Sequence, residues 1–344
     1  MKTKLTNSNV SDVRRKTLKT LFLPLTVTAL SSWPALAQTR ELPVGQVKII
    51  CGFPPGGTTD ITGRLIGGKI SDSFYTKNHV VIENKTGASG RLAIEAVKNS
   101  VPDGSTLLVS SYSMLVLYPY TSRNLTYDPF KDFAPVAIGS AQPVGLAVGP
   151  MVPTTVKNVK DFIAWCKANP DRANYASPGA GAIPHLLGTL LSLNSGVSMQ
   201  HVAYRGSVPG VTDLIGGQVA SMLTPLGDFL SNHRAGKLRI LATSGKSRSR
   251  FAPEVASFAE QGYPELSVEI WFGFYAPAKT PSNVVAAANT AINNAIKNKT
   301  VVDGLSTLGL TPVGGNVEEV TKEMHRLSDY WGPIIKRIGF TEDS

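Results

Sequence analysis

The sequence of 344 residues lacks most of the patterns on which enzyme and metal sites are built. Its five histidines are dispersed, and neither a CxxC nor an HExxH metal-binding pattern occurs. The GxSxG nucleophile elbow and the GxxxxGK(S/T) phosphate loop are also missing. Of its two cysteines, Cys51 falls in a predicted strand and Cys166 in a predicted helix of another domain. We therefore expect two separate buried thiols, no metal and no cofactor.

The sequence has no apolar run that is long enough to span a bilayer. The mostly apolar residues 21–30 are interrupted by Pro24, and residues 14–19 before them carry two arginines and two lysines. An A-x-A cleavage site follows at Ala35-Leu36-Ala37. This pattern predicts a signal peptide over residues 1–37, cleaved after Ala37, and export to the periplasm. The pair Arg14-Arg15 also resembles a twin-arginine signal.

Without this leader, the chain has little excess charge. The leader carries six of the 34 Lys and Arg residues and one of the 24 Asp and Glu residues, so its removal lowers the formal net charge from +10 to +5. One basic cluster remains at residues 246–250, without the interleaved aromatic residues of a single-strand-binding groove. We interpret this cluster as a solvated loop and expect no nucleic-acid partner.

A strand, a glycine turn and a helix start follow one another near the beginning of the predicted exported chain. The apolar residues 47–52 lead into Pro55-Gly56-Gly57-Thr58. Two consecutive glycines let the backbone approach a ligand closely, and the first N–H groups of a helix are unpaired donors. The junction therefore suits an anion, although a tight turn without a ligand explains this loop alone equally well.

A second junction of the same kind occurs in the middle of the chain. The predicted strand at residues 174–177 opens into Pro178-Gly179-Ala180-Gly181-Ala182, and an apolar helix follows. Strand-like and helix-like runs alternate for most of the length, which favours an α/β fold with mainly parallel sheets flanked by helices. Parallel sheets bind ligands beyond the carboxyl ends of their strands, so two such loops from facing domains can close on one solute.

These segments resemble the substrate-binding proteins of tripartite tricarboxylate transporters, the Bug receptors of the bacterial periplasm. The resemblance covers nearly the whole predicted exported chain, and the motifs that carry it include Pro55-Gly56-Gly57-Thr58-Thr59-Asp60, Pro102-Asp103-Gly104, Ser177-Pro178-Gly179, Tyr204-Arg205-Gly206, Gly217-Gln218-Val219 and Trp271-Phe272-Gly273. It implies a two-lobed periplasmic binding protein of type II-like architecture, with two crossing segments at the hinge. We expect lobe 1 to comprise residues 38–146 and 270–344, and lobe 2 to comprise residues 147–269.

The resemblance also implies a ligand site and partners. The cleft of such a receptor holds a small carboxylate or related solute, mainly through backbone N–H groups and waters, and a membrane permease receives it. The candidate ligand-binding residues are Pro55, Gly56, Gly57, Thr58, Asp60, Ser177, Gly179, Ala180, Gly181, Ala182, His185, Tyr204 and Arg205. A monomer suits such a shuttle. The chain departs from the family pattern at Ala182, Ala220 and Ser89, so the resemblance does not transfer the identity of the ligand.

Single candidates have two interpretations each. Asp60 either caps the first loop or contacts the ligand, and a carboxylate there would repel an anion. His185 either touches the ligand or bonds to its own loop. Arg205 is a carboxylate partner or an exposed cation, and Tyr204 is a stacking wall or part of the core. Two other function classes stay open: an exported α/β enzyme, and a receptor that presents its closed form to a periplasmic sensor domain.

Overall fold

A computed structural model of the chain describes residues 42–341. In this part of the chain, ten strands join in one sheet with the order β2-β1-β3-β9-β4-β7-β5-β6, and β10 and β8 each pair with β4. The strands are β1 (Lys48–Cys51), β2 (Val81–Asn84), β3 (Thr106–Ser111), β4 (Phe133–Val148), β5 (Asn174–Ser177), β6 (Gln200–Ala203), β7 (Ser221–Pro225), β8 (Arg239–Thr243), β9 (Glu269–Pro277) and β10 (Thr311–Gly314).

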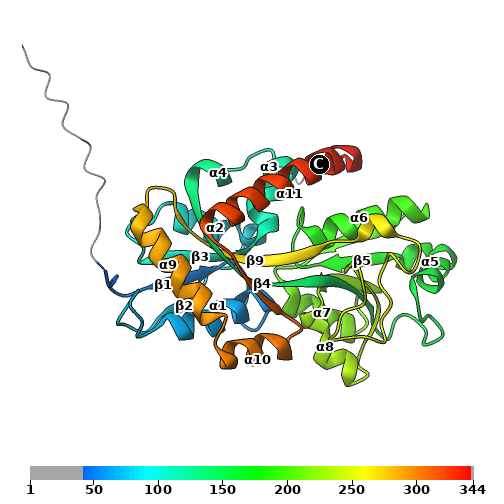
Figure 1. Ribbon diagram of the computed structural model, residues 1–344. Helices are drawn as coiled ribbons and strands as arrows, with labels where there is room; N and C mark the ends of the chain where they lie inside the picture. The colour runs from blue at the N-terminus through cyan, green and yellow to red at the C-terminus, as the bar shows by residue number, and fades with distance from the viewer. Residues whose placement is uncertain (1–41, 342–344) are drawn as a thin grey trace, which may run out of the picture. The chain divides into compact units, whose positions relative to one another are not determined.

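Parallel pairs make up the two ends of the sheet, as the sequence predicts. Strand β1 pairs in parallel with β2 and β3, and β5 pairs in parallel with β6 and β7. The pairs in the middle, β3–β9, β9–β4 and β4–β7, are antiparallel. Figure 1 shows β4 and β9 running together between the end that holds β1, β2 and β3 and the end that holds β5. These two strands therefore connect both ends of the sheet.

Strand β4 is longer than the sequence predicts. Residues 135–139 and 144–148 read as separate apolar runs interrupted by proline and glycine, but the structure joins them in one strand of 16 residues. The pairing with β9 shifts register between Pro135 and Ala137 and again between Ile138 and Ser140. A proline has no N–H to donate to a neighbouring strand, and such irregularities accommodate it without ending the strand.

Helices cover the sheet, and two of them lie at residues 91–98 and 317–338, where the sequence predicts helical stretches. The helices are α1 (Thr58–Ile70), α2 (Arg91–Lys98), α3 (Tyr118–Thr121), α4 (Pro129–Asp132), α5 (Val159–Ala168), α6 (Ile183–Ser195), α7 (Ser207–Ile215), α8 (Gly227–Arg234), α9 (Ser282–Ala295), α10 (Lys299–Thr307) and α11 (Val317–Ile338). The start of α11 is set by a capping box, in which Asn316 and Glu319 each bond the other's backbone N–H. Its end is set by Gly339, whose φ of +71° suits a glycine.

The core consists of apolar side chains at the predicted helical spacing. On α9, Val284, Ala288 and Ile292 are all buried. Both cysteines are free and buried, which confirms two separate thiols, and burial raises the pKa of Cys51 and of Cys166 to about 12. Neither thiol is a reactive nucleophile at neutral pH.

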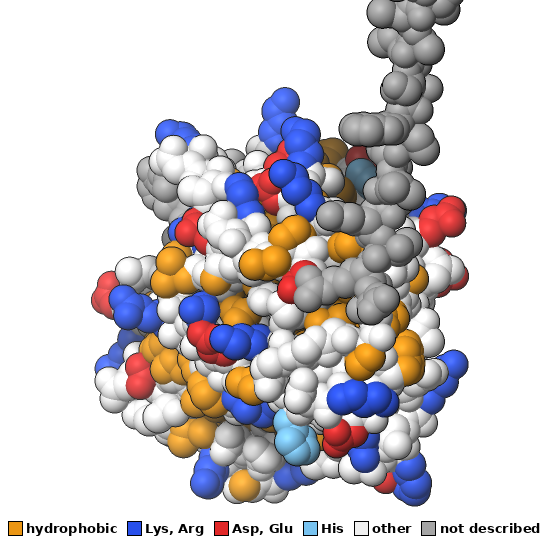
Figure 2. All heavy atoms as spheres, turned by 90° about the vertical axis from the view of Figure 1, so that its left-hand side faces the viewer, with side chains coloured by type: hydrophobic (Ala, Val, Ile, Leu, Met, Phe, Trp, Pro, Cys, Tyr) orange, Lys and Arg blue, Asp and Glu red, His pale blue; other side chains and the backbone are white. Residues whose placement is uncertain are grey.

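The surface carries charges of both signs. On the described part of the face in Figure 2, Lys and Arg side chains are dispersed and interspersed with Asp and Glu. A continuous basic surface, which nucleic-acid binding requires, does not occur on that part of the face. The predicted signal peptide lies outside the described residues.

Candidate functional site

The first glycine loop connects β1 to α1, and the side chain of Asp60 holds it in place. Gly56, with φ of +89°, donates its N–H to Oδ2 of Asp60 at 2.9 Å. Nδ2 of Asn84 donates to Oδ1 at 2.8 Å, and Arg64 pairs with Oδ2 at 2.9 Å. Burial opposes the ionisation of Asp60, but these hydrogen bonds outweigh it and lower its pKa. The Asp60 carboxylate therefore fixes the shape of the loop and is neutralised by Arg64.

The second glycine loop connects β5 to α6 and is held by two histidines. Gly181, with φ of +72°, donates its N–H to Nδ1 of His185 at 3.0 Å. The ring of His185 stacks on that of His201 at 3.7 Å, and Nε2 of His201 lies 2.8 Å from Oγ of Ser177. Burial lowers the pKa of His185 to about 3 and that of His201 to about 4. Both rings are therefore neutral at pH 7 and support the loop.

The two loops border one narrow cavity. It has a volume of about 40 Å³, which holds only about three water molecules. Its walls come from both ends of the sheet and from β9. The lining residues are Phe53, Pro54, Gly57, Thr58, Thr59, Ser111, Ser113, Met114, Pro178, Ala182, Pro184, Ser207, Val208, Pro225, Asp228, Ile270 and Phe272.

Contacts across this cavity are close. The Thr58 N–H donates to Oδ1 of Asp228 at 3.2 Å, and the Ile183 N–H donates to Oγ of Ser113 at 3.4 Å. A Cβ atom at Gly57 would lie 3.3 Å from Oγ of Ser207. Residues 70 or more positions apart thus meet at the starts of α1, α6 and α7, where helix N–H groups supply partial positive charge.

The predicted site residues fall into two groups. Gly57, Thr58 and Ala182 line the cavity. The others lie in or beside the same loops without lining it: Pro55, Gly56, Asp60, Ser177, Gly179, Ala180, Gly181, His185, Tyr204 and Arg205. The Tyr204 hydroxyl donates to Oδ2 of Asp213 at 2.7 Å, and Arg205 is exposed.

Four polar lining residues outside the two glycine loops are not among the candidates that the sequence predicts. Ser111 is the last residue of β3 and Ser113 lies just beyond it, Ser207 begins α7, and Asp228 is the second residue of α8. Each lies where a strand gives way to a helix, which is the signal that identified the two glycine loops. These junctions have no glycine pair, so the sequence alone did not distinguish them from ordinary turns.

Asp228 is an unusual carboxylate because all its bonded partners are neutral. Its oxygens accept hydrogen bonds from the Thr58 N–H at 3.2 Å and from the Thr224 hydroxyl at 2.9 Å. Burial raises its pKa to about 6, and these hydrogen bonds only partly offset that effect. Its side chain is partly accessible, which agrees with its place on the cavity wall.

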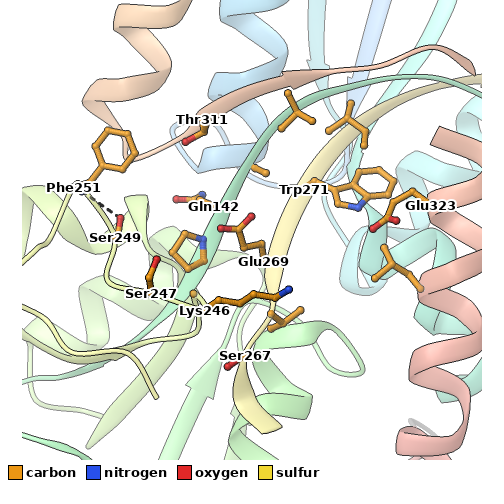
Figure 3. A pocket seen from close by; sticks show the side chains of 18 of the residues that line it. Gln142, Lys246, Ser247, Ser249, Phe251, Ser267, Glu269, Trp271, Thr311 and Glu323 are labelled. Atoms are coloured by element: carbon orange, nitrogen blue, oxygen red, sulfur yellow. Dashed lines mark hydrogen bonds between the residues drawn. The ribbon is translucent and has the colours of Figure 1, made fainter. Parts of the chain in front are cut away.

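A larger cavity of about 920 Å³ lies on the opposite side of β9 (Figure 3). Because side chains alternate along a strand, Ile270 and Phe272 face the small cavity, whereas Glu269 and Trp271 face the large one. Figure 3 shows the side chains of Glu269 and Trp271 at this cavity, together with Lys246 from the loop after β8. No predicted site residue lines it, and its acidic and basic side chains are mixed, so the small cavity is the better candidate site.

Among residues 42–341, no group of His, Cys, Asp and Glu side chains is arranged to hold a metal ion. None of the helices there combines the length and the apolar composition that a membrane crossing needs.

Comparisons with known proteins agree with this fold. A family model described as "Tripartite tricarboxylate transporter family receptor" matches residues 73–340. The chain is 32% identical over 298 residues to Protein BugT of Bordetella pertussis, which is 86% of this chain and 90% of that protein.

Solved structures show the same architecture. One is MatC (Rpa3494) from Rhodopseudomonas palustris with bound malate, with a TM-score of 0.80 and 28% identity over 86% of this chain and 100% of that chain. Another is Rpa4515 of R. palustris with adipate, with a TM-score of 0.82 and 28% identity over 88% of this chain and 99% of that chain. The chain therefore has the mixed α/β fold of periplasmic binding proteins.

Proposed function

The chain belongs to the tripartite tricarboxylate transporter receptor family and is a Bug-type solute-binding receptor, and from this premise we propose that it captures a small carboxylate or related organic solute in the periplasm and delivers it to a membrane permease. The observation that carries the proposal is that both glycine loops border one cavity, through Gly57 and Thr58 on one side and Pro178 and Ala182 on the other. Relatives with bound malate and adipate support the class of solute.

Binding would use backbone donors at helix starts. A carboxylate between the loops would meet the N-termini of α1 and α6, each worth about 0.3–1 kcal/mol when exposed and up to about 2 kcal/mol when partly buried. Charge-assisted hydrogen bonds from the N–H groups would add to this. The remaining predicted residues of both loops would hold these backbone N–H groups in position.

Access would require the walls to separate, because a cavity of about 40 Å³ is too small for malate or adipate. We propose that residues 38–146 with 270–344 form one lobe, that residues 147–269 form the other, and that the lobes hinge at the crossing strands β4 and β9. A solute that touches both glycine loops would then favour the closed form.

The alternatives predict different behaviour. An exported enzyme would need a nucleophile with a base, and no histidine or cysteine is among the described lining residues beside Ser111, Ser113 and Ser207. We propose that the protein does not catalyse a reaction. A sensor-linked receptor would have the same cavity but a different protein partner. We propose a permease partner and a monomeric receptor.

The test is a thermal unfolding assay of the exported chain against panels of dicarboxylates, amino acids and aromatic acids. A receptor gives a melting temperature that rises with the concentration of its solute by mass action. Turnover of any compound would instead support an enzyme, and no rise with any acid would contradict carboxylate capture. Loss of uptake of the identified solute in a deletion strain would support delivery to a permease, and unchanged uptake would contradict it.

A further inference from the structure

We infer that Asp228 makes the proposed cavity selective for solutes that pair a carboxylate with an ammonium group, and that it disfavours plain dicarboxylates. The inference rests on the proposed function, because it takes the solute to bind between the two glycine loops. Beyond that function, we assign Asp228 as the side chain that selects the solute and an ammonium group as the feature that it binds.

The charge of the lining is the first argument. Among the described residues that line the cavity, Asp228 alone has an ionisable side chain. The others are apolar, hydroxyl-bearing or glycine, and neither the cation Arg205 nor the neutral His185 lines the cavity. A dicarboxylate would thus place two negative charges beside a third. A zwitterion would bring its own compensating cation to Asp228.

The position of Asp228 is the second argument. Its Oδ1 accepts the Thr58 N–H at 3.2 Å, and that N–H belongs to the helix start that would also attract a solute carboxylate. The Asp228 carboxylate and the proposed carboxylate position therefore share one edge of the cavity. An amino acid carries its ammonium and carboxylate groups on the same carbon, so its two charged groups match this proximity.

The unused bonding capacity of Asp228 is the third argument. An ionised carboxylate offers about four acceptor positions. Two are used, by the Thr58 N–H and by the hydroxyl of Thr224, and both donors are uncharged. Acceptor positions are therefore left for a cationic donor. The side chain is partly accessible where it faces the cavity, so a solute can reach it.

The experiment uses acids that differ only by an ammonium group, with the exported chain and its Asp228→Asn variant. The pairs are aspartate with succinate, glutamate with glutarate, and alanine with propionate, and dissociation constants are measured by calorimetry at pH 7.5. For a pair that binds, we expect the wild-type protein to prefer the amino acid by about tenfold or more. Asp228→Asn should reduce that preference by about tenfold, because it weakens the amino acid and improves the plain acid.

The controls separate this inference from the proposed function. Asp171→Asn removes one negative charge at an exposed position away from the cavity and should leave the preference unchanged. Tighter binding of the plain acids by the wild-type protein would overturn the inference while leaving carboxylate capture intact, and this result does not depend on whether the variant folds. An equal loss for both members of a pair in Asp228→Asn would mean that Asp228 only holds the structure. Failure of every acid to bind would overturn both claims.

Discussion

The Thr58 N–H donates a hydrogen bond to Oδ1 of Asp228 at 3.2 Å, although the two residues are 170 positions apart. Thr58 belongs to the first glycine junction, and Asp228 is the second residue of α8, which follows β7. This bond connects the two ends of the sheet at the N-terminus of α1, where the proposed solute would bind.

Gly57→Val should abolish the solute-dependent rise in melting temperature and leave the fold intact. Gly57 has φ of −78°, so a side chain is compatible with its backbone, but a Cβ would lie 3.3 Å from Oγ of Ser207 and larger atoms would fill the cavity. Thermal unfolding with and without solute measures the effect. Gly45→Val is the control, because no atom lies within 4 Å of its Cβ position. An unchanged rise in Gly57→Val would exclude the first loop from the site.

Asp60→Asn should loosen the first loop and lower the free energy of unfolding by about 1–3 kcal/mol. The substitution removes the negative charge that pairs with Arg64, and it leaves one acceptor oxygen where the Gly56 N–H and Asn84 Nδ2 now share two. Chemical denaturation measures the loss, and Asp171→Asn, at an exposed position, is the control. A stability equal to that of the wild-type protein would contradict the supporting role of Asp60.

The stacked histidines should make the protein sensitive to acid. Their pKa values in the folded chain, about 3 for His185 and about 4 for His201, lie below the ordinary value of 6.5. Between these limits the unfolded chain binds more protons, so stability that is present above pH 6.5 is lost as the pH falls. The loss should be of the order of 2 kcal/mol per histidine at pH 5.

Denaturation curves at pH 7.5 and pH 5 measure this loss. In His201→Gln the loss should be smaller, because one titrating group is gone and glutamine can still bond Ser177. His79→Gln changes an exposed histidine and should behave as the wild-type protein does. Equal losses in His201→Gln and His79→Gln would show that the buried pair does not control the acid response.

Asp228 should act on stability in the opposite direction. Its pKa of about 6 in the folded chain exceeds the ordinary 3.8, so the folded chain binds more protons between these values. Its contribution to stability is therefore present below about pH 3.8 and falls as the pH rises toward 6. In Asp228→Asn this opposing contribution disappears, so the net loss of stability between pH 6 and pH 4.5 should be larger than in the wild-type protein. The same denaturation series tests this, and an unchanged loss would mean that Asp228 titrates normally.

The sequence predicted the elements whose signals are local. The sequence predicts helical stretches at residues 91–98 and from about 317 to 338, and the structure contains both as α2 and α11. The sequence showed two separate apolar runs where the structure has the single strand β4. The register shifts near Pro135 that allow this depend on the partner strand β9 and not on neighbouring residues. Antiparallel pairing in the middle of the sheet is likewise a property of distant segments.

The candidate site divides in the same way. The glycine loops were visible because a glycine pair after a strand is a local pattern, and the structure brings them to one cavity. Asp228 was not visible, because its importance comes from a contact with Thr58, far away in the sequence. His185 accepts the Gly181 N–H and so bonds to its own loop, which was one of its two interpretations. The sequence could not choose between them, because the position of the ring depends on its stacking against the distant His201.

Hydrogen–deuterium exchange with and without the identified solute tests the central claim most directly. The account predicts that the solute protects the amides at both glycine loops, around Gly57 and around Ala182, in the same experiment. Protection of one loop alone, or protection confined to the large cavity around Trp271 and Lys246, would contradict it.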